Sequence, residues 1–404
     1  MEPASRRRPP GSLSALRRTN TRRVVDALRG ARSLSRAEIA RLTGLSRSTV
    51  STVVGDLLET GLLREGAADR PSISGTGRRG VTVSINPSAG AALGIDIAHD
   101  GVRAIVADLA GTVLCERVRV LDTASLDPDA IVDAAADTAR EALDAAGMQD
   151  ERLVGCAASV PAPVDPGTGE LGAESSIPAL AGTRVSRMLS ARLGMAVHVE
   201  NDANLCALAE RMWGDRAGHD TMIYVKVSRG VGAGLVVGGR IHRGAHGNAG
   251  EIGHTSVAPD GPVCRCGNRG CLELMVGSDA LTAAASSRGD EVLPSIDDVV
   301  RRALDDDPVA RRAIRDVGTL LGQALGAAVN VLNPSLVVVG GELTPAWPIL
   351  ETPLREALDR RAVHRSAEAM VMTPGSLGRR TEALGAVGQV LREGGRVAAT
   401  GLVA

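Results

Sequence analysis

Residues 249–273 read AGEIGHTSVAPDGPVCRCGNRGCLE and combine soft metal ligands with acidic groups in one short segment. The candidate metal ligands in it are His254, Cys264, Cys266 and Cys271. Four protein ligands fill a zinc tetrahedron and leave no open position, so the pattern predicts structural rather than catalytic zinc. Three reduced core cysteines beside an unrelated histidine are the alternative. The Pro, Arg and Gly neighbours disfavour this alternative, because they indicate a loop over residues 254–271, which we call the metal loop.

Acidic and amide side chains flank this loop and recur earlier in the chain. Residues 200–204 read ENDAN at an expected strand-to-helix junction, and Glu251 and Glu273 flank the metal ligands. Carboxylates accept hydrogen bonds from hydroxyl groups, and the carboxylate of Asp202 beside a bound hydroxyl could also take its proton as a general base. Each group taken alone is equally consistent with a surface charge or a helix cap, and Asp202 is itself a candidate N-cap.

Two glycine-rich segments lie next to expected strands, as nucleotide-binding turns do. They are GVGAG at residues 230–234 and the pair Gly340-Gly341. Structural turns need the same glycines, so these residues alone leave a nucleotide site and a plain turn equally open.

From about Leu93 onward, short apolar runs alternate with helical periodicity, which predicts an α/β architecture. The expected strands are 91–97, 102–108, 112–114, 154–160, 196–199, 222–227, 234–237 and 335–339. The expected helices are 128–147, 184–193, one beginning at Ala203, and 309–331. The cysteines outside the metal loop lie in apolar runs and are expected in the core; they are Cys115, Cys156 and Cys206.

The other end of the chain is basic: residues 1–80 hold 16 Arg against 7 acidic residues, and residues 81–404 carry a net charge of −10. Ser35 and Glu38 form a capping box that opens a short helix. Its expected inner face is Ile39, Ala40 and Leu42. A turn at 43–45 and a second cap at Ser46 follow, which predicts a helix-turn-helix. The side chains expected to contact DNA are Arg36, Arg47, Ser48, Thr49, Ser51 and Thr52, with Arg78 and Arg79 near a wing tip.

Residues 62–64 and 81–85 can pair as that wing, which completes the winged helix-turn-helix order. The predicted domains are a disordered basic tail at 1–14, the winged helix-turn-helix at 15–86 and the α/β body at 87–404. Arginine–phosphate contacts would give salt-dependent affinity for double-stranded operator DNA, while the outer face of residues 47–52 would read bases. A small solvated helical domain without a DNA partner is the alternative.

The composition favours a cytoplasmic protein with no membrane partner. The N-terminus is polar and basic without an apolar run behind it, so no secretory signal is expected. The longest uncharged stretch, residues 317–341, contains polar residues and a proline that indicate a helix, a turn and a strand. Six cysteines in 404 residues do not make a disulfide scaffold. A single lysine, Lys226, among 46 basic residues indicates a compositional bias towards arginine.

These motifs together resemble the ROK family, named for repressors, open reading frames and sugar kinases. The resemblance covers nearly the whole chain. It rests on the winged helix-turn-helix, the strand at 94–96, residues 199–204, the segment 249–273, and Asn333-Pro334 with Gly340-Gly341. It implies a two-lobed actin-like, sugar-kinase (ribonuclease H-like) ATPase fold joined to the winged helix-turn-helix, with a sugar bound between the lobes.

By the same resemblance, five positions would bind sugar hydroxyls: Asn201, Asp202, Glu251, His254 and Glu273. His254 would also hold zinc, and Asp202 would be the catalytic base of a kinase. Kinase members carry Gly-Gly-Thr after the first-strand aspartate and Gly-Thr-Gly in a second phosphate loop. Here residues 97–100 read IAHD and residues 228–230 read SRG. Residues 161–165, PAPVD, also replace the usual Pro-Gly-Pro.

An added carboxylate where triphosphate should lie repels it. We therefore expect phosphoryl transfer to be weak or absent, with structural Zn²⁺ as the cofactor and no need for ATP and Mg²⁺. The leading hypothesis is a sugar-responsive transcriptional regulator, expected to repress carbohydrate metabolism or uptake genes. Two-fold reading of an operator predicts a homodimer or higher homo-oligomer. The alternative is an active ATP-dependent sugar kinase that carries a DNA-binding domain; a regulator that no longer binds sugar is a third possibility.

Overall fold

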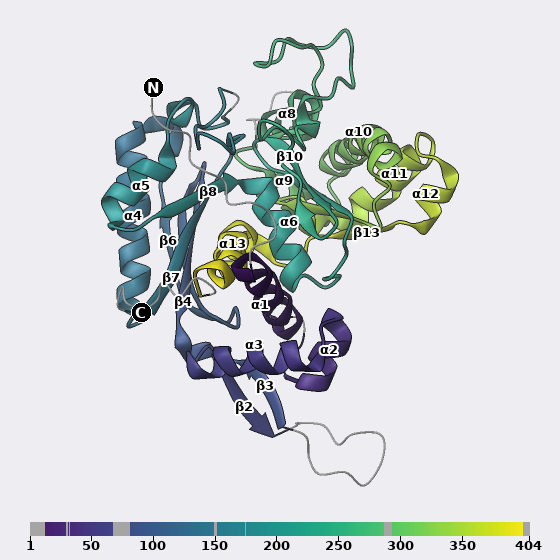
Figure 1. Cartoon of the computed structure of the whole chain (residues 1–404). Helices are drawn as coiled ribbons and strands as arrows, with labels where there is room; N and C mark the ends of the chain where they lie inside the picture. Colours follow the sequence, from purple (N-terminus) through teal and green to yellow (C-terminus); the bar gives the residue numbers. More distant parts are fainter. Residues whose placement is uncertain are drawn as a thin grey trace, which may run out of the picture.

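The computed structural model describes residues 13–29, 31, 33–67, 81–148, 152–173, 175–286 and 293–398. These residues form a small helical unit with a three-stranded sheet and a larger body with two five-stranded sheets. Figure 1 shows the small unit packed below the body, with its first helix next to the last helix of the chain. None of the helices described has the length and apolarity needed to cross a membrane.

The small unit has the winged helix-turn-helix order. Its elements are α1 (Leu13–Arg29), β1 (Leu34–Ser35), α2 (Arg36–Thr43), α3 (Arg47–Glu59), β2 (Leu63–Ala67) and β3 (Val81–Ile85). Ser35 accepts a hydrogen bond from the Glu38 amide and completes the capping box, and Ser46 caps α3 by accepting from Thr49. Gly44 ends α2 at φ +66°, a left-handed conformation that favours glycine. Local capping therefore sets the predicted turn.

Several details of this unit differ from the sequence-based expectations. Leu42 was expected on the inner face of α2, but it is 60% exposed, because Ile39 and Thr43 are the buried positions of that helix. Helix α1 begins at Leu13, inside the range predicted as a disordered tail, and an ion pair of 2.7 Å between Arg17 and Asp56 ties its first turns to α3. The predicted wing-tip residues Arg78 and Arg79 lie outside the described residues.

The first lobe of the body is built on a sheet with the strand order β6-β5-β4-β7-β8. Its elements are η1 (Pro87–Ala89), β4 (Ala91–Ala98), β5 (Gly101–Asp108), β6 (Val113–Val120), η2 (Thr123–Ser125), α4 (Pro128–Ala145), β7 (Leu153–Val160), η4 (Pro178–Leu180), α5 (Val185–Leu193) and β8 (Val197–Asn201). Strands β4, β5 and β6 are antiparallel neighbours, whereas β7 and β8 join in parallel. Helices α4 and α5 cover one face of this sheet.

The second lobe has the strand order β11-β10-β9-β12-β13. Its elements in the first part of the lobe are α6 (Asp202–Trp213), β9 (Met222–Val227), β10 (Val231–Val237), β11 (Arg240–Ile241), η5 (Ile252–His254), α7 (Leu272–Val276) and α8 (Ser278–Ala285). The remaining elements are α9 (Ile296–Leu304), α10 (Pro308–Leu332), β12 (Leu336–Gly341), η6 (Thr344–Ala346), α11 (Trp347–Asp359), α12 (His364–Ala369), β13 (Val371–Pro374), η7 (Gly378–Arg380) and α13 (Thr381–Ala398).

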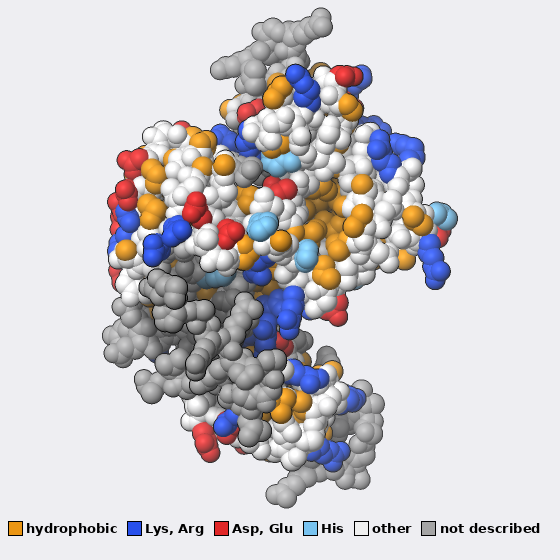
Figure 2. All heavy atoms as spheres, turned by 45° about the horizontal axis from the view of Figure 1, so that its top comes forward, with side chains coloured by type: hydrophobic (Ala, Val, Ile, Leu, Met, Phe, Trp, Pro, Cys, Tyr) orange, Lys and Arg blue, Asp and Glu red, His pale blue; other side chains and the backbone are white. Residues whose placement is uncertain are grey.

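Two helices join the lobes and the winged helix. Helix α6 follows directly from β8 and packs on β9 and β10, while α13 lies against α6 and the first-lobe strands β4 and β7. Helix α1 contacts α13, and Leu62 and Ile85 of the wing pack against the same apolar cluster. Arg29, at the end of α1, is largely but not fully buried, and this burial lowers its pKa to about 10 although Asp26 acts in the opposite direction. Basic side chains gather on the body beside this junction (Figure 2).

The body also corrects three expectations. The segment 230–234 was interpreted as a glycine-rich turn, but residues from Val231 onward form β10, paired antiparallel with β9. Glycine is needed at 234 because a Cβ there would lie 2.2 Å from the Ala203 carbonyl oxygen of α6. Asp202 was a candidate N-cap, yet Asn201 caps α6 and Asp202 occupies its first turn. Cys115, unlike Cys156 and Cys206, is only half-buried, because it lies on the edge strand β6.

Candidate functional site

A cavity of about 610 Å³ lies between the two lobes. The polar residues lining it include four of the predicted sugar-binding residues, Asn201, Asp202, Glu251 and Glu273. It is also lined by side chains that the sequence did not single out as site residues: Asp96, Lys226, Arg265, Glu342, Arg379 and Glu382. The fifth predicted residue, His254, lies behind Glu251, with 3.8 Å between its Nε2 and a Glu251 carboxylate oxygen.

The floor of the cavity is an ionic cluster around Lys226. The Lys226 ammonium lies 2.9 Å from Asp202 Oδ2 and 2.7 Å from Glu382 Oε1. Burial alone would lower the pKa of Lys226, but Asp202 and Glu382 outweigh it and hold that pKa well above its usual range. Asp96 lies in the same cluster, and burial together with Glu382 raises its pKa to about 7. The cluster therefore carries both a fixed cation and a carboxyl group that titrates near neutral pH.

The junction of β8 and α6 presents Asn201 and Asp202 to the cavity. Asn201 Oδ1 accepts from the Asn204 amide, and its Nδ2 donates to the Ala162 carbonyl oxygen at 3.1 Å. The buried carboxylate of Glu200 accepts from Asn204 Nδ2 and from the Arg243 guanidinium. Glu200 and Arg243 therefore brace the junction from behind, which leaves Asp202 facing the cavity.

Glu273 enters the cavity from the start of α7. Its Oε2 accepts a hydrogen bond of 3.1 Å from the Val231 amide, and its carboxylate pairs with Arg265 at 2.9 Å. Arg265 lies between two predicted metal ligands, so the metal loop delivers a guanidinium into the cavity as well as a carboxylate. A bound hydroxyl would have to share Glu273 with Arg265.

The four predicted metal ligands come together. Their ligand atoms all lie within 4.8 Å of one another, with His254 Nδ1 3.6 Å from Cys264 Sγ and Cys266 Sγ 3.6 Å from Cys271 Sγ. With zinc–sulfur bonds of about 2.3 Å, a tetrahedron places its sulfur atoms about 3.8 Å apart, so this spacing fits zinc. Nδ1 faces the thiols, whereas Nε2 faces Glu251. One imidazole thus connects the candidate metal centre to a carboxylate of the cavity.

Gly250 sets the position of Glu251. Its φ is +100°, and a Cβ there would lie 1.8 Å from the Ala233 carbonyl oxygen of β10. The Ala233 amide also donates to the Gly250 carbonyl oxygen at 2.8 Å. The chain that leads into the loop at 254–271 is therefore fixed to the second-lobe sheet immediately before Glu251, which faces the cavity.

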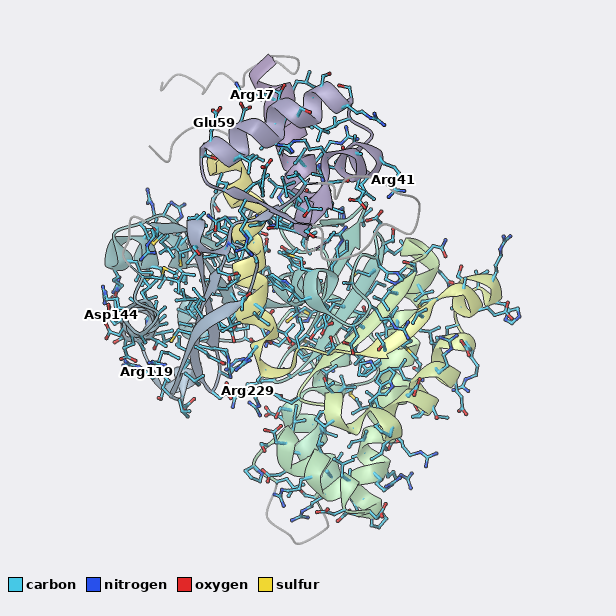
Figure 3. The ribbon with its side chains drawn as sticks, turned by 90° about the horizontal axis from the view of Figure 1, so that it is seen from below. Arg17, Arg41, Glu59, Arg119, Asp144 and Arg229 are labelled. Atoms are coloured by element: carbon cyan, nitrogen blue, oxygen red, sulfur yellow. The ribbon has the colours of Figure 1, made fainter. Side chains whose placement is uncertain are left out.

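Residues 97–100 and 228–230 line another part of the cavity. His99, on the β4–β5 turn, contacts Ser176 Oγ through Nε2 at 3.0 Å, and Ser176 donates its hydroxyl proton to the Pro161 carbonyl oxygen. Nε2 of His99 must therefore be the donor in the first contact. Burial, with Arg229 nearby, lowers the pKa of His99 to about 4, so its ring is neutral at pH 7. Arg229 lies at the opening between the lobes (Figure 3).

Acidic groups surround this half of the cavity. Arg379 of η7 pairs with Asp100 of the first lobe at 3.5 Å and with Asp297 at the start of α9 in the second lobe. Glu342, directly after Gly341, accepts from Ser228 at 3.4 Å, and burial raises its pKa. Carboxylates and a cross-lobe ion pair thus line this part of the cavity.

The candidate DNA-contacting face lies on α3. Arg47, Ser48, Ser51 and Thr52 are exposed there, and Thr49 is half-buried with its hydroxyl 2.8 Å from the Ser46 hydroxyl. Arg36, which was also predicted to contact DNA, makes a contact within the winged helix instead. Arg36 pairs with Glu65 of the wing at 2.9 Å, so it braces α2 against β2. Arg41, on α2, is exposed and points away from the body (Figure 3), although the sequence argument had not selected it.

A DNA-reading unit and a two-lobed body with a polar cavity define the class: a DNA-binding transcriptional regulator with a sugar-kinase-like domain. Residues 92–393 match the ROK family model, and residues 19–70 match the MarR family model. The chain belongs to the ROK family.

Relatives and solved structures agree with that assignment. The xylose repressor of Bacillus subtilis is 29% identical over 87% of this chain and 89% of its own length. The DNA-binding transcriptional dual regulator NagC of Escherichia coli is 28% identical, covering 87% of each chain. A ROK family transcriptional regulator homologous to the E. coli MLC protein shares the fold with a TM-score of 0.80, at 24% identity over 96% of this chain and 100% of that one. A ROK family glucokinase from Streptomyces griseus, in complex with glucose and AMPPNP, has a TM-score of 0.63 at 26% identity and covers 74% of this chain and 98% of its own.

Proposed function

We propose that the protein is a repressor of carbohydrate genes whose body senses a neutral sugar and does not phosphorylate it. The observation that carries this proposal is that one cavity is lined both by the expected hydroxyl-binding groups and by the acidic residues that follow the first strand. Asp202, Glu251 and Glu273 line the cavity, and the ion pairs of Arg379 with Asp100 and Asp297 lie where we propose that a triphosphate would otherwise bind. Phosphoryl transfer depends on positioned phosphates and Mg²⁺.

The sugar would lie between the Asn201–Asp202 junction and the metal loop. We propose that Asn201, Asp202, Glu251, His254 and Glu273 bind its hydroxyl groups and that Zn²⁺ on His254, Cys264, Cys266 and Cys271 holds the loop in place. The names of the curated relatives, xylose repressor and N-acetylglucosamine repressor, support a pentose or hexose as the effector.

Sugar binding would reach DNA through the lobes. A ligand that bridges the lobes favours the arrangement that binds it more tightly, and DNA affinity changes only if that arrangement holds the winged helix differently. The contact of α1 with α13, a helix packed on both α6 and the first lobe, supports this route. We propose a homodimer or higher oligomer that acts on operator DNA in the cytoplasm, because two winged helices specify a longer site than one.

The second candidate function is an active sugar kinase, which the retained Asp202 favours. Incubation of the zinc-loaded full chain with ATP, Mg²⁺ and D-xylose, D-glucose or N-acetyl-D-glucosamine separates the two. Our proposal predicts no sugar phosphate above the level of an Asp202→Asn control. Turnover at ordinary kinase rates, about 1–100 per second, would make the protein a kinase instead.

A further inference from the structure

Lys226 is the only lysine of the chain, and it lies at the centre of the cavity floor. Its side chain extends from β9 and is 14% exposed. The ammonium contacts Asp202 of α6 and Glu382 of α13, whose side chains are 14% and 13% exposed. It therefore joins three elements at the point where the two lobes meet.

The three carboxylates of this cluster need a cation. Asp96, Asp202 and Glu382 are all largely buried, and like charges at such distances raise one another's energy unless an opposite charge lies between them. An ammonium is a compact charge with three donors, whereas guanidinium is a wide planar fork. The other 45 basic residues of the chain are arginines, and its single lysine lies where a compact cation fits.

A divalent cation is the other common solution for clustered carboxylates. Mg²⁺ binds carboxylate oxygens at about 2.0–2.1 Å and keeps several waters, so it needs the space that the ammonium fills here. We propose that Lys226 is a built-in cation that replaces a metal ion in this cleft. It excludes divalent cations and holds Asp202 in place as a hydrogen-bond acceptor for the ligand.

The Asp202 carboxylate is also fixed in its orientation. Its Oδ1 accepts from the Ala203 amide at 2.7 Å and its Oδ2 from Lys226, so both oxygens have a fixed donor. A carboxylate held in this way is oriented to accept a hydrogen bond from a ligand hydroxyl. Lys226 is therefore a positioning residue for ligand recognition, a role that rests on the proposed sensing function.

Manganese binding to the zinc-loaded full chain tests the metal part without any knowledge of the sugar. We expect free Mn²⁺, measured by electron paramagnetic resonance, to be unaffected by the native chain. The Lys226→Met variant should take up one Mn²⁺ per chain, and adding Asp202→Asn to that variant should abolish the uptake. Uptake by the native chain that Asp202→Asn removes, or a folded Lys226→Met variant that gains no Mn²⁺, would overturn the proposal.

The native chain provides a second readout if Lys226→Met does not fold. With ¹³C at lysine Cε, the protein gives a single lysine signal. Millimolar Mg²⁺ should not change the chemical shift of that signal. The signal should also keep the chemical shift of a protonated amine beyond about pH 10.4, the usual pKa of lysine. A shift with Mg²⁺ or an ordinary titration would contradict the proposal.

The sugar part is measured separately, by thermal shift with D-xylose, D-glucose and N-acetyl-D-glucosamine. Any stabilisation should be the same with and without Mg²⁺, and a dependence on Mg²⁺ would count against a built-in cation. If none of the three sugars stabilises the protein, the sensing proposal loses support, while the Mn²⁺ experiment still decides the role of Lys226.

Discussion

At the scale of single residues, the cavity floor places charged groups where their protonation is coupled to folding. One cluster brings together residues that lie far apart in the sequence: Asp96, Asp202, Lys226 and Glu382. Burial and Glu382 raise the pKa of Asp96 to about 7, so the folded protein holds a proton there that the unfolded chain releases near pH 4. Between these two values, folding gains less as the pH rises.

An Asp96→Asn substitution should therefore stabilise the protein increasingly with pH. The variant lacks a carboxyl group whose ionised form is disfavoured by burial, and each pKa unit corresponds to about 1.4 kcal/mol. Compared with the native chain, its free energy of unfolding should be similar at about pH 4 and higher by a few kcal/mol at about pH 8. Urea denaturation across that range measures the difference, and a difference that is constant with pH would contradict the raised pKa.

Arg47 is the residue at which the DNA-reading assignment is most directly tested. It is exposed at the start of α3, where a base contact is worth about 1–3 kcal/mol, so Arg47→Ala should weaken operator binding by roughly 5- to 150-fold. Fluorescence anisotropy on DNA selected by the native protein measures this. Arg312→Ala, which removes an exposed arginine on α10, should have no effect. Unchanged binding by Arg47→Ala, or loss of folding, would remove Arg47 from the interface.

At the scale of elements, the metal loop between η5 and α7 is expected to behave as one unit with the sheet behind it. Gly250 fits against Ala233 of β10, and Glu251 and Glu273 enter the cavity from either end of the loop. A structural zinc ion supplies folding energy to such a loop, because metal binding holds its four ligands together.

Cys266→Ser should lower zinc content from about one ion per chain and loosen this loop. Serine is a poor zinc ligand, so Glu251 and Glu273 should lose their fixed positions and sugar-induced stabilisation should fall with the metal. Atomic absorption and thermal shift provide the two measurements. Cys115→Ser, at a half-buried position of β6, is the matched control and should keep its zinc. Unchanged zinc in Cys266→Ser would refute the metal site.

Elements set by local chemistry were predictable from the sequence, whereas those set by distant partners were not. The caps at Ser35 and Ser46 act within three residues, and the helix-turn-helix followed from them. Strand β10 was shortened in the prediction because its glycines resemble a turn, although they allow close approach to α6. The side chain of Lys226 meets Glu382 from 156 positions away, and no sequence pattern links the two. The single lysine was a visible signal that was attributed to composition alone.

At the scale of the whole molecule, the basic N-terminal region and the acidic body divide the work of DNA binding and sensing. The net charge of −1 is a cancellation between them. The winged helix packs against the body, because α1 contacts α13 and the wing residues Leu62 and Ile85 belong to an apolar cluster that also includes body residues. These contacts are the route by which we propose that a change of lobe arrangement would move α3.

The central claim is that sugar in the cleft controls DNA binding without being phosphorylated. The most direct measurement is the affinity of the zinc-loaded full chain for its selected DNA, by fluorescence anisotropy, with and without D-xylose, D-glucose or N-acetyl-D-glucosamine. At least one sugar should change the dissociation constant by about 5- to 150-fold, and ATP with Mg²⁺ should add nothing. DNA affinity that none of these sugars changes, together with turnover of a sugar and ATP, would contradict the account.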